Sequence, residues 1–235
     1  MNTQLAVTII TPTTGKDSLF RLIESITKQK VPVKHIILWD DKREGIFLKK
    51  NLSPFTLEKQ EYWDKFRYLA ECHVVKGTSV QGTAYGSMLR AVGLMLATTD
   101  YVVFADDDVI WEENHLITML QLMDKHEWGF CKRKIWHKLN DTEFEYLGID
   151  EFESVGEDSK TPYKMVDNSS MIFKRKYGVS AACLYRETKD YNDDRQMYDF
   201  LKTYAGEPGK TNMATINQTC PTRLENFFRI NCTKN

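Results

Sequence analysis

The sequence lacks the features that mark membrane-anchored, secreted and nucleic-acid-binding proteins. None of its apolar runs approaches the roughly 20 residues that a membrane-spanning helix needs. Its first residues, Met1–Leu5, have neither the basic region nor the apolar region of a signal peptide. The net charge is −1, from 32 basic and 33 acidic residues, so no excess of positive charge favours nucleic acid as a partner. We therefore expect a cytoplasmic protein without a transmembrane segment.

The chain also lacks the cysteine pattern of a disulfide-linked or zinc-binding protein. Its five cysteines are an odd number and form no Cys-x-x-Cys pair, which argues against a zinc site and fits reduced thiols. No internal repeat and no low-complexity linker interrupts the 235 residues, of which 42% are hydrophobic. We therefore expect one domain over residues 1–235, with an ample core.

What the sequence does contain is an alternation of short β-rich segments with helical patterns. Residues 6–10 and 35–39 fit buried strands, and apolar residues recur at helical spacing between Asp17 and Gln29. A strand, a helix and a second strand imply a right-handed parallel crossover, so both strand ends lie at one edge of the sheet. The sequence thus predicts an α/β fold with a mixed, mostly parallel sheet flanked by helices. We also expect strands at 72–75, 101–104 and 129–132, helices at 57–69, 87–97, 112–126 and 223–228, a loop-rich excursion or hairpin at 141–160, and otherwise irregular chain after 206.

Three consecutive aspartates follow the strand expected at 101–104. Asp106, Asp107 and Asp108 would lie at the C-terminal edge of the sheet, where open α/β sheets bind ligands. Carboxylates this close repel one another, and a hard cation such as Mg²⁺ or Mn²⁺ relieves that repulsion while bridging substrate phosphates. In extended chain Asp106 and Asp108 point the same way, so we expect Asp108 to bind the metal and Asp106 to reach the same ion or a sugar hydroxyl. An ordinary acidic turn is the alternative that the triplet alone leaves open.

Two further acidic pairs lie near expected element ends. Asp40 and Asp41 close the second strand, and Asp193 and Asp194 precede a helical stretch. A helix start also explains acidic residues structurally, because the helix dipole stabilises them there. One carboxylate set for a metal-held phosphate and a separate carboxylate for proton transfer fit a displacement from a nucleotide-activated substrate.

These segments resemble glycosyltransferases of the GT-A fold, most of all the inverting glycosyltransferase family 2. The resemblance runs from Val7 to about Leu201 and implies a nucleotide-binding half near 1–110 and an acceptor-binding half near 111–235. It is carried by the first strand with its Pro-Thr turn, Val7–Thr13, and by Ser25–Gln29, His35–Asp41, Arg90–Leu94, Ala97–Asp108 and Asn192–Asp194.

The resemblance implies a metal-dependent enzyme that moves a sugar from a nucleotide sugar, most of all a UDP-sugar, to an acceptor hydroxyl with inversion. It places Mn²⁺ or Mg²⁺ on Asp108 with Asp106, and the catalytic base on Asp194, with Asp193 where the family has Glu. The acceptor would be a glycan, a lipid-linked molecule or a small molecule, and Asp167–Ser170 is the segment expected to face it. The residues implied on the nucleotide are Thr11, Pro12, Asp40, Asp41, Arg90, Asp106 and Asp107.

Three other functions fit parts of the pattern. A sugar-phosphate nucleotidyltransferase would carry a glycine-rich loop with Arg and Lys after the first strand, and Thr11–Lys16 does not provide one. A non-catalytic nucleotide-sugar-binding module would need no base, so the acidic pair at Asp193 counts against it. A retaining glycosyltransferase on the same fold would differ in product stereochemistry. Structural alternatives also exist for Arg90, as a helix-surface residue, and for Lys132–Lys134, as a solvated basic face.

Overall fold

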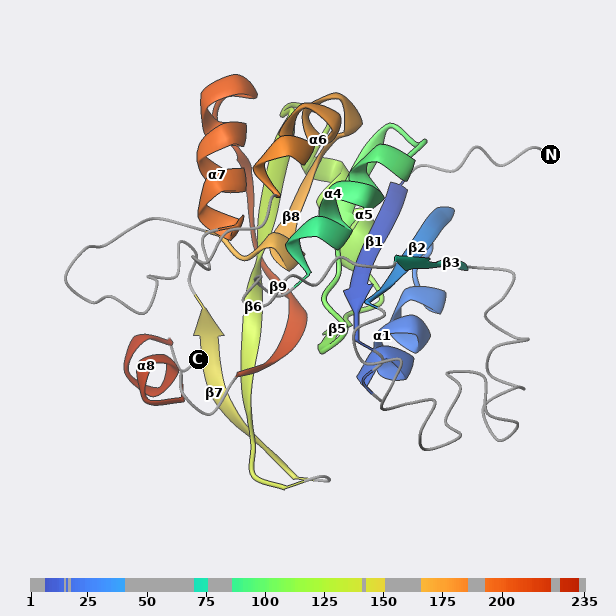
Figure 1. Ribbon diagram of the computed structural model, residues 1–235. Coiled ribbons are helices and arrows are strands. Elements are labelled where there is room, and N and C mark those ends of the chain that lie inside the picture. Colours follow the sequence, from blue (N-terminus) through green and yellow to red (C-terminus); the bar gives the residue numbers. More distant parts are fainter. Residues whose placement is uncertain are drawn as a thin grey trace.

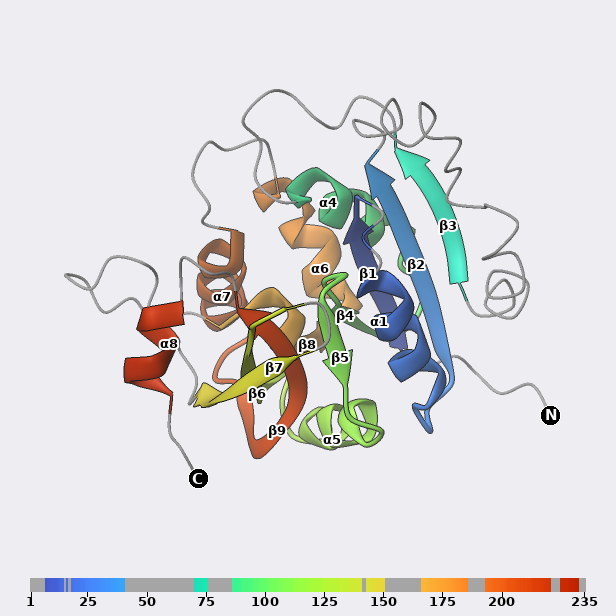
Figure 2. The ribbon, with the colours of Figure 1, turned by 90° about the horizontal axis from the view of Figure 1, so that it is seen from below.

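The computed structural model describes residues 7–14, 16, 18–40, 70–75, 86–140, 143–150, 166–185, 193–220 and 225–232. Their strands form one nine-stranded mixed sheet in the order β3-β2-β1-β4-β8-β6-β9-β5, with β7 paired to β6 (Figure 1). β3 and the C-terminal helix α8 (Glu225–Asn231) lie at opposite ends of the molecule (Figure 2). The expected α/β fold with a mixed sheet flanked by helices is confirmed.

Parallel strands make up the N-terminal half of the sheet. β1 lies between β2 and β4, and Ile9 in its centre pairs with His35 on one side and Val103 on the other. β1 is buried along its whole length and β4 along most of its length, because helices cover both faces of this part of the sheet. Their C-terminal ends therefore meet at one edge, as expected for a parallel crossover. The four strands are β1 (Val7–Thr13), β2 (Val33–Asp40), β3 (Ala70–Val75) and β4 (Tyr101–Phe104).

Mixed pairing makes up the C-terminal half. β8 runs antiparallel to β4 and β6, while β9 is parallel to β6 and antiparallel to β5. The expectation of irregular chain after residue 206 was wrong for β9, which has few apolar residues and is held by its long pairing with β6. The expected strand at 129–132 is part of a longer one. The five strands are β5 (Val109–Trp111), β6 (Trp128–Lys138), β7 (Phe144–Asp150), β8 (Met171–Lys174) and β9 (Gly209–Cys220).

Helices cover the two faces of the sheet and define two hydrophobic cores. α1 (Ser18–Thr27) and α5 (His115–Leu122) pack on one core, and α4 (Ser87–Leu96), α6 (Arg175–Ala181) and α7 (Asp193–Tyr204) pack on the other. α4 lies very close to β1, since a Cβ placed on Gly93 would fall 2.4 Å from Cγ2 of Ile10. The position of α4 matters because its first turn enters the site described below.

A third, smaller core lies beneath α8 (Figure 1). α8 packs against β7, which forms an antiparallel hairpin with β6 as expected for part of 141–160. The core consists of Ile135, Leu147, Cys220, Phe228 and Cys232. The helix expected at 57–69 lies outside the described residues. None of the helices that the structure describes combines the length and the apolarity that crossing a lipid bilayer requires.

Candidate active site

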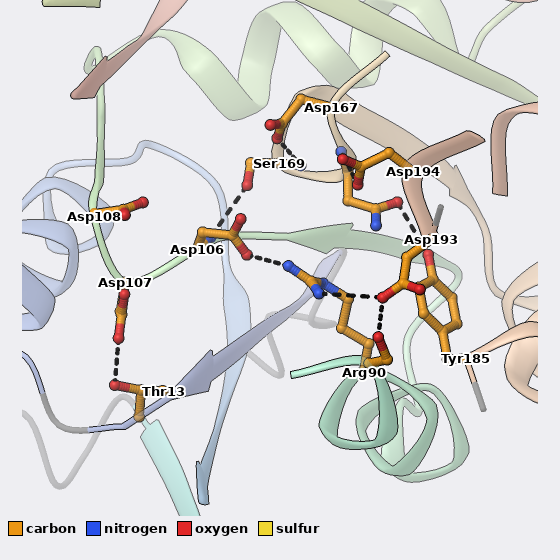
Figure 3. Close-up of polar contacts among 12 residues, drawn as sticks. Thr13, Arg90, Asp106, Asp107, Asp108, Asp167, Ser169, Tyr185, Asp193 and Asp194 are labelled. Atoms are coloured by element: carbon orange, nitrogen blue, oxygen red, sulfur yellow. Dashed lines mark hydrogen bonds and ion pairs between the residues drawn. The ribbon is translucent and has the colours of Figure 1, made fainter. Parts of the chain in front are cut away.

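The C-terminal end of β4 and the first turns of α4 and α7 bring distant acidic and basic residues together (Figure 3). Asp106 lies two residues after the end of β4, Arg90 lies in the first turn of α4, and Asp193 and Asp194 begin α7. The Ser87 hydroxyl, at the start of α4, donates to Oδ2 of Asp193 across 106 positions of sequence. Two of the three expected acidic groups therefore share one site.

Arg90 joins the aspartate triplet to α7. Its Nη2 donates to Oδ1 of Asp106 at 2.5 Å, and its Nη1 lies 4.0 Å from Oδ2 of Asp193. The residue is 5% exposed, and its guanidinium lies 5.9 Å from the ring centroid of Phe104. A buried arginine on these partners is not the helix-surface arginine that the sequence allowed. Its contact with a nucleotide stays a prediction.

The other two aspartates of the triplet face Lys16. Asp107 is buried and accepts from the Thr13 hydroxyl at 2.7 Å and from Nζ of Lys16 at 2.8 Å. The same ammonium lies 3.4 Å from Oδ2 of Asp108. In Figure 3 the side chain of Asp107 points toward Thr13, and Asp106 lies close enough to Asp108 to raise the pKa of that carboxyl. A metal ion shared by Asp106 and Asp108 stays a prediction. Residues 107 and 108 form a turn between β4 and β5, where the sequence predicted extended chain.

The surroundings of the triplet make its negative charge costly. Withdrawal from water, followed by the nearby charge of Asp106, raises the pKa of Asp108 to about 6, and Lys16 only partly offsets this. Burial also raises the pKa of Asp106, against the effect of Arg90. A bound cation would lower both values. The triplet is thus a set of mutually repelling carboxylates that a bound cation would stabilise.

Asp108 fits one ligand of a hard divalent ion. Its side chain is 40% exposed and its carboxylate is an oxygen donor of the type that Mg²⁺ and Mn²⁺ prefer. Among the described residues, no three His, Cys, Asp or Glu side chains gather closely enough to hold a metal by themselves. An ion at Asp108 would therefore need further oxygens from phosphate and water.

The two aspartates of α7 have different surroundings. Asp193 is 8% exposed, is held by Ser87, and has a buried Oδ1 with no hydrogen-bond partner among the described residues. Asp194 is less buried, and its Oδ1 accepts the backbone N–H of Asn168 at 3.2 Å. Withdrawal from water and the charge of Asp167 raise the pKa of Asp194 to about 8. Asp194 therefore has the pKa of a proton acceptor that operates near neutral pH.

A short 3₁₀ helix, η3 (Asn168–Ser170), holds Asp194 from the acceptor-side segment expected at 167–170. Asp167 caps it by accepting the backbone N–H of Ser169 at 2.9 Å, and the Tyr185 hydroxyl donates to Oδ1 of Asn168 at 3.0 Å. The Ser169 hydroxyl accepts the backbone N–H of Asp106 at 3.2 Å. η3 thus contacts both the triplet and the carboxylate of α7.

Arg133 is the residue that sequence reasoning missed. Its Nη1 donates to Asp167 at 2.7 Å and to Oε1 of Gln218 at 2.6 Å, and its guanidinium also binds Asp150. It is 6% exposed, so the interpretation of Lys132–Lys134 as a solvated face was wrong for its central residue. The strand expected at 129–132 ended one residue before Arg133, so no signal in the sequence separated it from its lysine neighbours.

The remaining expected residues contribute less. The Thr11 side chain is fully buried with its hydroxyl 2.9 Å from Nε2 of His35, so a nucleotide contact of Thr11 would involve its backbone. Pro12 lies against the start of α4, where a Cβ on Gly86 would fall 2.8 Å from that of Pro12. The backbone of Asp40 ends β2 at the expected edge. The side chain of Asp40 and all of Asp41 lie outside the described residues.

The arrangement can separate two chemical tasks. The triplet offers partly exposed carboxylates and a lysine that could hold a metal-bound diphosphate. Asp194 offers a carboxylate that holds its proton up to about pH 8 and can exchange it with a bound hydroxyl. η3 connects the two through its hydrogen bonds to Asp106 and Asp194, and Figure 3 shows Asp106 between Asp108 and Asp194.

Comparisons with known proteins show a relation at the level of the fold. No protein-family model matches the sequence, and no curated protein sequence does. The crystal structure of S. aureus TarS 1–349 in complex with UDP-GlcNAc superposes with a TM-score of 0.61 at 15% identity, covering 92% of this chain and 59% of that one. The complex of TarS 1–349 with UDP gives 0.59 at 16% identity, covering 94% and 62%.

The larger structure of S. aureus TarS gives a TM-score of 0.57 at 16% identity, covering 94% of this chain and 38% of that one. The chain thus spans about three fifths of the length of the TarS 1–349 structures. The protein has their fold, the GT-A-type fold that the sequence resemblance implied. At 15–16% identity this similarity establishes the fold alone. The reaction has to be inferred from the residues of the site.

Proposed function

We propose that the protein is a glycosyltransferase that uses a nucleotide sugar, a UDP-sugar above all, and transfers the sugar with inversion to an acceptor hydroxyl. The observation that carries the proposal is the pairing of the open triplet at Asp106–Asp108 with the proton-holding carboxylate of Asp194, which η3 joins through its hydrogen bonds to Asp106 and Asp194. Two structures with the same fold contain UDP-GlcNAc and UDP, which supports this class of donor.

In the proposed reaction Asp194 acts as the base. Its carboxylate takes the proton of the acceptor hydroxyl as that oxygen bonds to the anomeric carbon of the donor. The bond from this carbon to the diphosphate oxygen breaks, and its electron pair leaves with the nucleoside diphosphate. Attack from the face opposite the leaving group inverts the anomeric configuration. The raised pKa of Asp194 suits it to this proton transfer.

Asp108, with Asp106, would hold the metal ion, Mn²⁺ or Mg²⁺. When bound, the ion would supply positive charge that neutralises the leaving diphosphate. Asp106 is already held by Arg90, so Asp108 is the more available of the two carboxylates. η3 fixes the backbone N–H on which Asp194 rests and thereby orients the base. The acceptor would approach from the side of η3.

The test is to follow nucleoside diphosphate release from a panel of UDP-sugars in the presence of Mn²⁺, with water and simple sugars as acceptors. The proposal expects UDP release from at least one donor and a product whose anomeric configuration, read by NMR, is opposite to that of the donor. A product with retained configuration would refute the inverting mechanism. Consumption of nucleoside triphosphate and sugar phosphate instead would identify a nucleotidyltransferase.

A further inference from the structure

Lys16 is a charged residue for which the proposed reaction has so far no role. It follows β1, and its ammonium lies 2.8 Å from Oδ1 of Asp107 and 3.4 Å from Oδ2 of Asp108. Its side chain is 51% exposed, in contrast to the 5% exposure of Arg90 on the other side of the triplet. The triplet is therefore balanced by one fixed cation and one cation that water can reach.

The two aspartates that Lys16 contacts depend on it to different degrees. Asp107 is buried and also accepts from the Thr13 hydroxyl, so it keeps a strong partner if the lysine leaves. Asp108 is 40% exposed, and within the described part of the chain Lys16 is the basic residue that forms an ion pair with it. The lysine thus occupies the side of Asp108 that faces its neighbour Asp107.

A divalent ion on Asp108 would meet the ammonium of Lys16 at short range. Two cations on one carboxylate repel each other, and the repulsion from a doubly charged ion is twice that from a single charge. The negative charge of a diphosphate removes this conflict, because it attracts both cations. Lysine suits such a change of partner, since its ammonium is a point charge on a flexible four-carbon stem and phosphate is one of its usual partners.

We propose that Lys16 competes with the divalent metal for Asp108 in the donor-free protein and binds the diphosphate once nucleotide and metal are present. This inference rests on the proposed function, because it assigns Lys16 as a ligand of the same donor. It goes further by predicting opposite effects of one residue on the metal alone and on the nucleotide with metal. A lysine that only stabilised the turn after β4 would not produce that reversal.

The experiment compares Lys16→Met with the wild type by isothermal titration calorimetry in two arms. In the first arm Mn²⁺ is titrated without nucleotide, and in the second UDP is titrated at saturating Mn²⁺. We expect the variant to bind Mn²⁺ more tightly by about threefold to tenfold and UDP more weakly by about tenfold, the size of one charged contact. Lys16→Arg keeps the charge and should stay within about twofold of the wild type for Mn²⁺, because the guanidinium also opposes the metal.

Lys28→Met is the matched control, since Lys28 directly follows α1, is 53% exposed and forms an ion pair with Glu24, far from the triplet in sequence. It should leave both arms unchanged. Equal or weaker Mn²⁺ binding by Lys16→Met, or unchanged UDP binding, would overturn the proposal. A wild type that binds no UDP would instead contradict the proposed function, while the Mn²⁺ arm would still decide whether lysine and metal compete.

Discussion

The two acidic clusters of the site balance their charge in different ways. The triplet after β4 comes from consecutive residues, and Asp107 and Asp108 are balanced by Lys16, whose side chain is half exposed. The cluster around α7 collects Asp150, Asp167 and Asp194 from separate elements, with the buried Arg133 between the first two.

The comparison shows that one fold can balance acidic residues in two ways, with an exposed lysine that a ligand can replace or with a buried arginine that stays in place. Partly exposed carboxylates that pair with a lysine on a flexible side chain can accept and release a metal-bound ligand. Buried carboxylates that are locked by arginine must keep their geometry, because removing one partner leaves an uncompensated charge. We therefore expect substitutions in the triplet to affect ligand binding and those in the α7 cluster to affect catalysis and stability.

The largest expected effect is on the rate of transfer. Asp194→Asn removes the proposed base and should lower the rate of sugar transfer by about 10²–10⁴-fold, the usual contribution of general base catalysis. Binding of UDP with Mn²⁺, measured by calorimetry, should change little. Asp199→Asn, at an exposed position on the same helix, is the control and should keep full activity. Full activity of Asp194→Asn would remove the base from the mechanism.

The next effect is on stability. Arg133→Met keeps much of the side-chain volume but leaves Asp150 and Asp167 without their buried cation, which should cost about 3–5 kcal/mol of unfolding free energy. Urea denaturation at pH 7 measures it. Lys138→Met, at the exposed end of the same strand, should cost less than about 1 kcal/mol. Similar stabilities of the two variants would show that the α7 cluster is not locked by arginine.

A pH dependence follows from the raised pKa of Asp194. The base must be a carboxylate, so the rate of transfer should rise about tenfold per pH unit below a pKa of about 8 and then level off. Rates measured from pH 5.5 to 9 at saturating donor give the profile. A flat profile across this range would contradict a base with a raised pKa.

The same pKa predicts the opposite trend for stability. The folded protein keeps the proton of Asp194 up to about pH 8, whereas the unfolded chain releases it near its ordinary value of 3.8. Between these values the folded state binds more protons, so stability from this group falls as pH rises. Asp194→Asn should therefore gain stability relative to the wild type at pH 8 compared with pH 5, as measured by urea denaturation at both values.

The smallest expected effect is the change in unfolding free energy when Lys16 is replaced. Lys16→Met removes a half-exposed ion pair, and exposed pairs contribute little because water screens them. The unfolding free energy should change by less than about 1 kcal/mol in urea, although the metal and nucleotide affinities change as proposed above. A loss as large as that of Arg133→Met would mean that the triplet is as rigidly locked as the α7 cluster.

The sequence predicted the parts of the molecule that depend on neighbouring residues. β1, β2 and β4 are apolar runs with polar ends, so their places and the edge that carries Asp106 could be found from local pattern. β9 could not, because its polar sequence becomes a strand only through pairing with β6. The turn at residues 107 and 108 was not predicted either, because three consecutive aspartates do not by themselves distinguish a turn from extended chain.

The site divides in the same way. The triplet and the acidic pair of α7 were visible as motifs, whereas the partners that set their properties lie far away in sequence. Arg133 contacts Asp167 from 34 positions away, and Ser87 contacts Asp193 from 106 positions away. Such contacts depend on how helices and strands pack, which single-sequence pattern does not contain.

The most direct test of the central claim is calorimetric titration of UDP into the wild type, Asp108→Ala and Asp124→Ala in the presence and absence of Mn²⁺. Asp124 is exposed in the turn after α5 and serves as the control. We predict that the wild type and Asp124→Ala bind UDP in a metal-dependent way, and that Asp108→Ala loses at least about tenfold in affinity, as expected for a lost charged ligand. UDP binding that is absent, or equal in all three proteins, would contradict a nucleotide-sugar site at the aspartate triplet.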